Sequence, residues 1–225
     1  MKKRRSQSTE DYLKAIYEIT LYEERASTTQ LAEYLDITPA SITGMIQKLS
    51  TQSPPLVEYQ KHRGVTLTPQ GQKVALETLR HHRLLELFLH DILGYPWDEV
   101  DEEAERLEHV ISEKFEERIA AVLGNPDLDP HGDPIPASDL SVPKVSRIRM
   151  SSLQPGQAAV ITRVNDTDAN LLRYLGKLGL YLNTRFTVTD YSEFDQNLSI
   201  KINDQDKTIV LGPGITENIF VAAKQ

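Results

Sequence analysis

The sequence of 225 residues contains no cysteine. Disulfide bonds, thiolate zinc sites and iron–sulfur clusters are therefore excluded, because each of them needs cysteine sulfur. Any metal ion held by this chain must be bound by carboxylate and imidazole groups, with carbonyl oxygens or water completing the coordination.

Long hydrophobic runs are also absent. No apolar stretch approaches the roughly 18–20 residues that a membrane-spanning helix needs. The basic start, Met1 to Arg5, leads into polar residues, unlike a signal peptide. We therefore expect a cytoplasmic protein with no membrane partner, whose length suits two or three small domains.

The net charge of −8 is distributed unevenly. Residues 1–75 hold 10 basic and 8 acidic residues (+2), residues 76–140 hold 5 and 17 (−12), and residues 141–225 hold 10 and 8 (+2). A DNA-binding protein needs positive charge only on the contacting face. The acidic middle segment favours a site for cations.

The N-terminal third has the pattern of a winged helix-turn-helix. A Thr-Pro pair at 38–39 is typical of a helix start, with threonine as N-cap and proline in the first turn. A turn at 60–64 that contains a glycine and carries basic residues at its tip is typical of a wing. The expected elements are helices over 8–23, 28–35 and 38–50 and strands over 56–59 and 65–67.

The helix expected over 38–50 would read DNA. Its hydroxyl and amide groups can contact base edges or phosphates, and lysines suit phosphates. No arginine lies on this face, so guanine-rich specificity is not expected. Small winged domains also mediate protein contacts, which is the alternative. The predicted DNA contacts are Thr28, Thr38, Pro39, Ala40, Ser41, Thr43, Gln47, Lys48, Lys61 and Arg63, with His62 and Lys2 to Arg5 as further backbone contacts.

Two further regions follow. Helices are expected from Pro69 to about Leu93 and from about Asp98 to Leu123, followed by a turn-rich connector over 125–136. Short alternating runs with one helix over 169–178 then predict a small β-barrel.

The expected fold class is mainly α with α+β ends. The expected domains are a DNA-binding domain over 1–73, a helical dimerisation and metal-binding domain over 74–140, and an SH3-like domain over 141–225. Strands are expected over 158–161, 185–188, 198–202, 208–211 and 218–221.

The acidic helix carries a candidate metal site. Glu105, Glu108 and His109 have i, i+3, i+4 spacing and share one helix face. His82 and Glu86 have i, i+4 spacing on the preceding helix. Carboxylates crowded at a core edge repel one another unless a cation neutralises them. The alternative is that they are ordinary surface carboxylates. A helical wheel drawn for this helix at 100° per residue predicts a buried stripe, formed by Val100, Leu107, Ile111, Phe115, Ile119 and Val122.

These residues resemble the diphtheria-toxin-repressor/manganese-transport-regulator (DtxR/MntR) family of metal-dependent repressors, over nearly the whole chain. The family's C-terminal domain is of the FeoA or SH3-like type. The shared segments, taken in this order along the chain, are specific to the family. They are Thr9 to Tyr17, the helix-turn-helix, Arg63 to Gly71, His82 to Glu86, Glu105 to His109, and Gly132 to Pro136.

The resemblance implies a primary metal site of Asp11, Glu105, Glu108 and His109. It implies a second site of His82, Glu86 and Asp101, with Asp168 contributed by the C-terminal domain. The iron-sensing branch has a sulfur ligand where this chain has Asp11 and Glu105, and hard oxygen ligands favour manganese. Lys14 stands where the shortest manganese-sensing members carry a glutamate ligand, and Leu171 replaces a second ligand from the C-terminal domain.

The resemblance implies a homodimeric repressor of metal-uptake genes that binds palindromic double-stranded DNA operators and has no small-molecule substrate. Mn(II) is the expected activator and Fe(II) the alternative, with Co(II), Zn(II) or Cd(II) able to substitute in vitro. A metal-independent winged-helix regulator is a competing hypothesis. A dinuclear carboxylate enzyme is disfavoured, because it needs ligand pairs from more helices.

Overall fold

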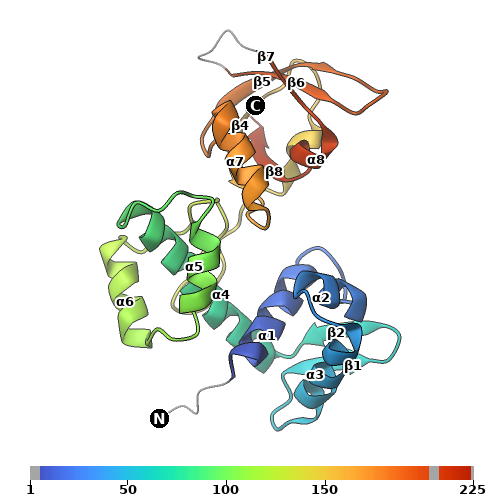
Figure 1. Cartoon of the computed structure of the whole chain (residues 1–225), viewed down its shortest axis with the longest axis vertical. Coiled ribbons are helices and arrows are strands. Elements are labelled where there is room, and N and C mark those ends of the chain that lie inside the picture. Colours follow the sequence, from blue (N-terminus) through green and yellow to red (C-terminus); the bar gives the residue numbers. More distant parts are fainter. Residues whose placement is uncertain (1–5, 203–207, 224–225) are drawn as a thin grey trace. The chain divides into compact units, whose positions relative to one another are not determined.

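The computed structural model describes residues 6–202 and 208–223 (Figure 1). The chain forms two compact units. The first comprises Met1–His82, Arg106–Glu116 and Pro136–Ser141, and the second comprises Arg83–Glu105, Glu117–Ile135 and Val142–Gln225. Among the described residues, no helix combines the length and apolar character needed to cross a membrane.

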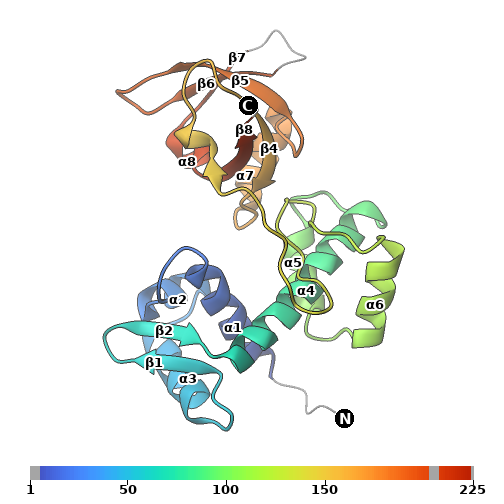
Figure 2. The same ribbon diagram turned by 180° about the vertical axis from the view of Figure 1, so that it is seen from behind.

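The first unit contains the expected winged helix-turn-helix. The Ser27 hydroxyl accepts the backbone N–H of Gln30, whose side chain accepts the N–H of Ser27, so a capping box begins the second helix. Thr38 caps the third helix through the N–H of Ser41. The elements are α1 Gln7–Thr20, α2 Thr28–Tyr34, α3 Pro39–Thr51, β1 Val57–Gln60 and β2 Gly64–Leu67, with β1 and β2 antiparallel (Figure 2).

The core of this winged domain holds α1 in place. Leu13 and Ile16 of α1 are fully buried together with Ile42 and Ile46 of α3. Removing such aliphatic side chains from water contributes about 1.5–3 kcal/mol each. The acidic residues of α1 therefore lie on a helix that packs firmly against α3, the helix predicted to read DNA.

The single helix predicted from about Asp98 to Leu123 is wrong. The structure has two helices, α5 Val100–Leu107 and α6 Glu113–Val122, after α4 Pro69–Asp91. The Ser112 hydroxyl accepts the N–H of Phe115 and begins the second helix, as N-cap residues do. Beyond the break the predicted buried stripe holds only at Ile119, which is 2% exposed, whereas Phe115 and Val122 are 48% and 64% exposed.

The second unit contains one six-stranded antiparallel sheet, in the order β3-β8-β4-β5-β6-β7. The five predicted strands and the predicted helix are present, and short β3 was not predicted. Leu172 and Leu175 of α7 pack into the core of the sheet. The elements are β3 Ile148–Arg149, η1 Met150–Ser152, β4 Ala158–Val164, α7 Ala169–Leu178, β5 Arg185–Tyr191, β6 Leu198–Ile202, β7 Thr208–Leu211, α8 Pro213–Thr216 and β8 Ile219–Ala223.

The predicted connector contains a loop that docks on β4. The backbone N–H of Val164 donates to the carbonyl oxygen of His131 at 2.9 Å. Gly132 has φ +88°, and a Cβ atom there would lie 2.1 Å from the carbonyl oxygen of Thr162. Trp97, which precedes α5, belongs to the same hydrophobic core as the sheet. The loop around His131 is therefore fixed by backbone contact.

Gly132→Ala is expected to destabilise the protein by about 2–4 kcal/mol, because an L side chain at positive φ costs about 1–2 kcal/mol and the clash adds a similar amount. Gly94→Ala is the matched control. Gly94 also has positive φ, +75°, but a Cβ atom there would have no other atom within 4 Å. Thermal unfolding with chelator present measures both variants, and equal melting temperatures would show that close contact with Thr162 is unimportant.

Candidate metal centre

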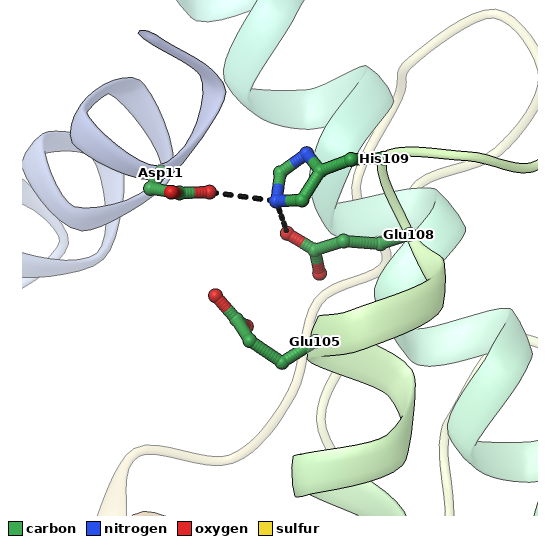
Figure 3. A group of neighbouring side chains, drawn as sticks. All are labelled: Asp11, Glu105, Glu108 and His109. Atoms are coloured by element: carbon green, nitrogen blue, oxygen red, sulfur yellow. Dashed lines mark ion pairs between the residues drawn. The ribbon is translucent and has the colours of Figure 1, made fainter. Parts of the chain in front are cut away.

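Three carboxylates and one imidazole meet in what we call the Asp11 cluster: Asp11, Glu105, Glu108 and His109 (Figure 3). One ligand atom from each residue lies within 4.8 Å of the others. Asp11 is on α1 and Glu105 is in the last turn of α5. Glu108 and His109 follow the end of α5, and the turn there keeps them close to Glu105. The structure therefore brings the four predicted residues together.

His109 is surrounded by carboxylates. Its Nε2 lies 2.7 Å from Asp11 Oδ1 and 3.2 Å from Glu108 Oε1, and its Nδ1 lies 2.7 Å from Glu10 Oε2. Burial alone would lower the pKa of His109, but the hydrogen bonds to Asp11 and Glu10 and the charge on Glu108 raise it to about 9. In the metal-free protein a proton therefore supplies positive charge at this position.

Glu108 is the most buried member of the cluster, with its side chain fully enclosed. Lys14 Nζ donates to both of its carboxylate oxygens, at 2.9 and 3.0 Å. His82 Nδ1 lies 2.6 Å from Oε2. Burial would raise the pKa of Glu108, but His82 and Lys14 outweigh it and lower the pKa. Glu108 is therefore held as a carboxylate.

Glu86 belongs to two further groups. One is the predicted set of His82, Glu86 and Asp101, whose ligand atoms lie within 4.8 Å of one another. The other, which we call the His131 cluster, consists of Glu86, His131 and Asp166 within the same distance. All three residues of the His131 cluster belong to the second unit.

His131 is fully buried and oriented like a metal ligand. Its Nε2 donates to the carbonyl oxygen of Trp97 at 2.6 Å, which leaves Nδ1 facing Glu86 Oε1 at 3.5 Å and Asp166 Oδ2 at 3.7 Å. Metal-binding histidines commonly donate their other N–H to a carbonyl or carboxylate in this way. Burial would lower the pKa of His131, but Glu86 and Asp166 raise it to about 10.

The surroundings of the His131 cluster carry excess negative charge. Asp129 and Asp133 lie beside it, and two guanidinium groups, those of Arg83 and Arg163, oppose them. With Glu86 and Asp166, four carboxylates face two guanidinium groups, which leaves two negative charges when these six groups are ionised and the His131 imidazole is neutral, as a metal ligand must be. Desolvation and the charge on Glu86 raise the pKa of Asp166 to about 7 and that of Asp129 well above its usual value. Such a site suits a divalent cation.

One predicted residue on the C-terminal side of this site lies away from it, and one residue of the site was not predicted. Asp168 was expected to donate a carboxylate, but it is exposed and caps α7 by accepting the N–H of Asn170 at 2.8 Å. Asp166, two residues earlier, is the carboxylate that reaches the cluster. His131 had no predicted role. The available signal was its position between Asp129 and Asp133 in a tight glycine-containing turn.

The predicted DNA contacts lie at the start of α2, along α3 and at the wing. Thr28 and Thr43 are half-buried, and Thr43 Oγ1 donates to the carbonyl oxygen of Pro39. Lys2 to Arg5 lie outside the described residues. The exposed members of the predicted set are Thr38, Pro39, Ala40, Ser41, Gln47, Lys48, Lys61 and Arg63, and His62 is exposed beside them.

Three family models match successive segments of the chain. The N-terminal DNA-binding domain of iron-dependent repressors matches residues 5–65. The iron-dependent repressor metal-binding and dimerisation domain matches residues 68–137, and the FeoA domain matches residues 148–223.

Individual proteins match as well. The iron-dependent repressor IdeR of Mycobacterium leprae is 34% identical over 197 residues, which cover 80% of this chain and 83% of IdeR. A solved manganese-dependent transcriptional repressor in complex with manganese is 38% identical, with a TM-score of 0.89, over 96% of this chain and all (100%) of that one. The manganese regulator SloR is 31% identical, with a TM-score of 0.80, over 96% and 98% of the two chains.

These matches confirm the family resemblance and the predicted fold class: an N-terminal helix-turn-helix domain, a helical metal-binding and dimerisation domain, and a C-terminal FeoA-type, SH3-like domain. The chain belongs to the iron-dependent repressor family of metal-dependent, DNA-binding transcriptional repressors.

Proposed function

We propose that this protein represses metal-uptake genes by binding palindromic double-stranded DNA operators as a homodimer when Mn(II) is abundant. The observation that carries this proposal is the Asp11 cluster. It joins a carboxylate of the winged domain's first helix to three side chains at the end of α5. Occupancy of these four ligands can therefore affect the element that positions the DNA-reading helix.

The ligand chemistry favours manganese. Asp11, Glu105 and Glu108 supply oxygen, His109 supplies nitrogen, and sulfur is absent from the set. Hard oxygen ligands suit Mn(II), although a given site generally binds Fe(II), Co(II) or Zn(II) more tightly, so selectivity must arise from geometry and metal availability. Fe(II) is the alternative activator, because IdeR, a relative of similar size, is an iron-dependent repressor.

The proposed mechanism is that a bound ion holds the four cluster residues together. The ion would supply the positive charge that lets the carboxylates of Asp11, Glu105 and Glu108 approach one another. Asp11 would then hold α1, and with it the packed core of the winged domain, to the segment that follows α5. The two recognition helices of a dimer must fit major-groove faces about one helical turn, or a multiple, apart. A ligand that binds the DNA-competent arrangement more tightly shifts the population toward it.

The proposal includes the His131 cluster as a second metal site. His131 offers a nitrogen with a fixed orientation, and the surrounding carboxylates exceed the guanidinium groups by two charges. The alternative set of His82, Glu86 and Asp101 shares Glu86 with it. We favour the His131 cluster because Asp101 is exposed and one nitrogen of His82 contacts Glu108. Asp168 is left out of the proposed ligands.

The exposed residues of α3 and the wing form the proposed DNA surface, with Lys48, Lys61 and Arg63 at phosphates. Affinity should therefore depend strongly on salt concentration. Three hydroxyls are already engaged within the protein: Thr38 caps α3, Ser41 Oγ lies 3.0 Å from Thr38 Oγ1, and Thr43 donates to the carbonyl oxygen of Pro39. The exposed amide of Gln47 is accordingly the better candidate for direct contacts with base edges.

The test is binding of promoter DNA measured by fluorescence anisotropy. Mn(II), anaerobic Fe(II), Co(II) and Zn(II) are each titrated and compared with a chelated sample. Wild-type protein is expected to bind only with metal, and Glu105→Ala is expected to lose the metal response because a ligand is missing. The order of the metals separates manganese from iron sensing.

Glu102→Gln is the matched control, because Glu102 is an exposed carboxylate of α5 outside the cluster. It should bind DNA with the metal dependence of the wild type. Equal binding by wild type with metal and with chelator would overturn the metal switch, and would leave a winged-helix regulator without metal input.

A further inference from the structure

The second unit contains a groove whose lining includes no member of the metal clusters. Its volume is about 820 Å³, and it lies between the end of α4, the segment 96–98, Pro130 and the last turns of α7. All of its lining residues belong to the second unit. Pockets of about 300–1,000 Å³ are the usual size for small organic ligands. The groove is therefore large enough for such a molecule.

Aromatic and proline rings form the apolar part of this groove. The rings of Trp97 and Tyr181 have centres 5.2 Å apart, and Pro96 and Pro130 line the groove beside them. The Tyr181 hydroxyl donates to the carbonyl oxygen of Gly176 at 3.2 Å, and a Cβ atom at Gly176 would lie 3.0 Å from that hydroxyl. Tyr181 is held in this position and is still 48% exposed. A ring that is already ordered can stack on a flat ligand at little further entropic cost.

One cation of the groove, Lys177, is exposed and has no ion-pair partner among the residues that the structure describes. It lies four residues after Arg173 on α7, so the two cations share a helix face. Arg173 Nη1 lies 3.3 Å from Asp98 Oδ2, and His90 Nδ1 lies 2.7 Å from Asp91 Oδ1. The two carboxylates of the groove are thus engaged by other residues. The ammonium group of Lys177 is therefore complementary to an anion brought by a ligand.

We propose that this groove binds a small molecule that combines a flat aromatic ring with an anionic group. The ring would stack on Tyr181, and the anionic group would lie at Lys177. The carbonyl oxygen of Trp97 accepts the His131 N–H at 2.6 Å, so the ligand would lie against the residue that orients His131. The site itself needs no metal ion, because the rings and the cation that form it are fixed by the protein.

The experiment titrates two dyes into the full-length protein in the presence of chelator. One is 8-anilinonaphthalene-1-sulfonate, a flat aromatic anion, and the other is 1-anilinonaphthalene, which has the same rings without the sulfonate. Energy transfer from Trp97, the only tryptophan of the chain, to the bound dye reports binding. We expect saturable binding of the sulfonate dye, with one molecule bound per chain.

Lys177→Glu tests the anionic contact. It should weaken binding of the sulfonate dye by about 10-fold, because an attraction is replaced by a repulsion. Binding of the neutral dye should not change. Tyr181→Ala should weaken binding of both dyes by about 10-fold, because the stacking surface is removed. Lys177 is exposed, so its exchange should leave folding intact and keeps the test valid even if Tyr181→Ala unfolds.

Lys144→Glu and Tyr174→Ala are the matched controls. Lys144 is an exposed lysine of the same unit outside the groove. Tyr174 is a tyrosine of α7 that is 42% exposed and lines a different cavity. Both variants should bind the two dyes like the wild type.

Three results would overturn the inference. The first is a wild type that does not bind the sulfonate dye saturably. The second is a folded Lys177→Glu variant with unchanged affinity for that dye, or control variants that lose as much affinity as Lys177→Glu. The third is a dissociation constant that rises with protein concentration, which would show that a second copy of the chain covers the groove. Promoter binding that ignores metal would overturn the proposed function and leave these results unaffected.

Discussion

Asp11→Asn is expected to raise the Mn(II) concentration needed for DNA binding by on the order of 100-fold or more. Substitutions that only disturb the partners of metal ligands already cost about 10–100-fold, and Asp11 is proposed to be a ligand itself. Asparagine keeps the shape of the side chain but removes the charge that lies 2.7 Å from His109 Nε2. Anisotropy titrations with a fixed DNA probe measure the shift.

Glu10→Gln provides a graded comparison on the same helix. Glu10 accepts from His109 Nδ1 at 2.7 Å, so it orients the imidazole and is outside the four-residue set. Its loss should shift the Mn(II) requirement by about 10-fold, at the lower end of effects for such partners. If Asp11→Asn responds to Mn(II) like the wild type, Asp11 is not a ligand. If Glu10→Gln has the larger effect, the two roles are reversed.

Arg83→Met is expected to destabilise the metal-free protein by about 3–5 kcal/mol, because removing one partner of a buried ion pair leaves uncompensated charge. Arg83 lies 3.7 Å from both Asp129 and Asp133 and donates to the carbonyl oxygen of Pro134 at 2.7 Å. For a protein of this size, that loss lowers the melting temperature by about 6–20 °C. Thermal unfolding at neutral pH with chelator measures it.

Arg118→Met is the control for this substitution, since Arg118 is an exposed residue of α6 and exposed charges contribute little. Its melting temperature should stay close to that of the wild type. Arg83→Lys should fall between the two, because lysine keeps the charge but lacks the planar fork of donors. A melting temperature of Arg83→Met within about a degree of the control would show that these carboxylates do not need a guanidinium partner.

The winged helix-turn-helix could be predicted because its signals are local. Ser27 with Gln30, and Thr38 with Pro39, fix two helix starts within a few residues of sequence. The break after α5 could not be predicted in the same way. Residues 105–109 favour helix on their own, and the chain leaves the helix where Glu108 and His109 meet partners some 94 to 99 residues away.

The Asp11 cluster was predictable in part. Helical spacing brought Glu105, Glu108 and His109 together on one face, and the turn that replaces the helix there keeps them close. Asp11 came from the family resemblance alone. The contacts made by Glu10 and Lys14 were not predicted, because nothing near them in sequence shows which side chains they will meet across the fold.

The His131 cluster required tertiary structure. Its three residues come from α4, the connector and the loop after β4, and they meet because the connector docks on β4. The resemblance pointed to Asp168, which caps α7, whereas the carboxylate that lies in the cluster belongs to Asp166, two residues earlier. Errors of this size are expected wherever a loop length decides which side chain points inward.

The packing of Trp97 has an optical consequence. It is the only tryptophan of the chain, so intrinsic fluorescence comes from a single place. Its ring centre lies 5.9 Å from that of His131 and 5.2 Å from that of Tyr181, and its carbonyl oxygen accepts the His131 N–H. Exchange of the His131 proton for a paramagnetic ion would change the emission of this indole directly. The protein thus carries a built-in, label-free reporter of events at His131, located in the second unit, while the first unit contains no tryptophan.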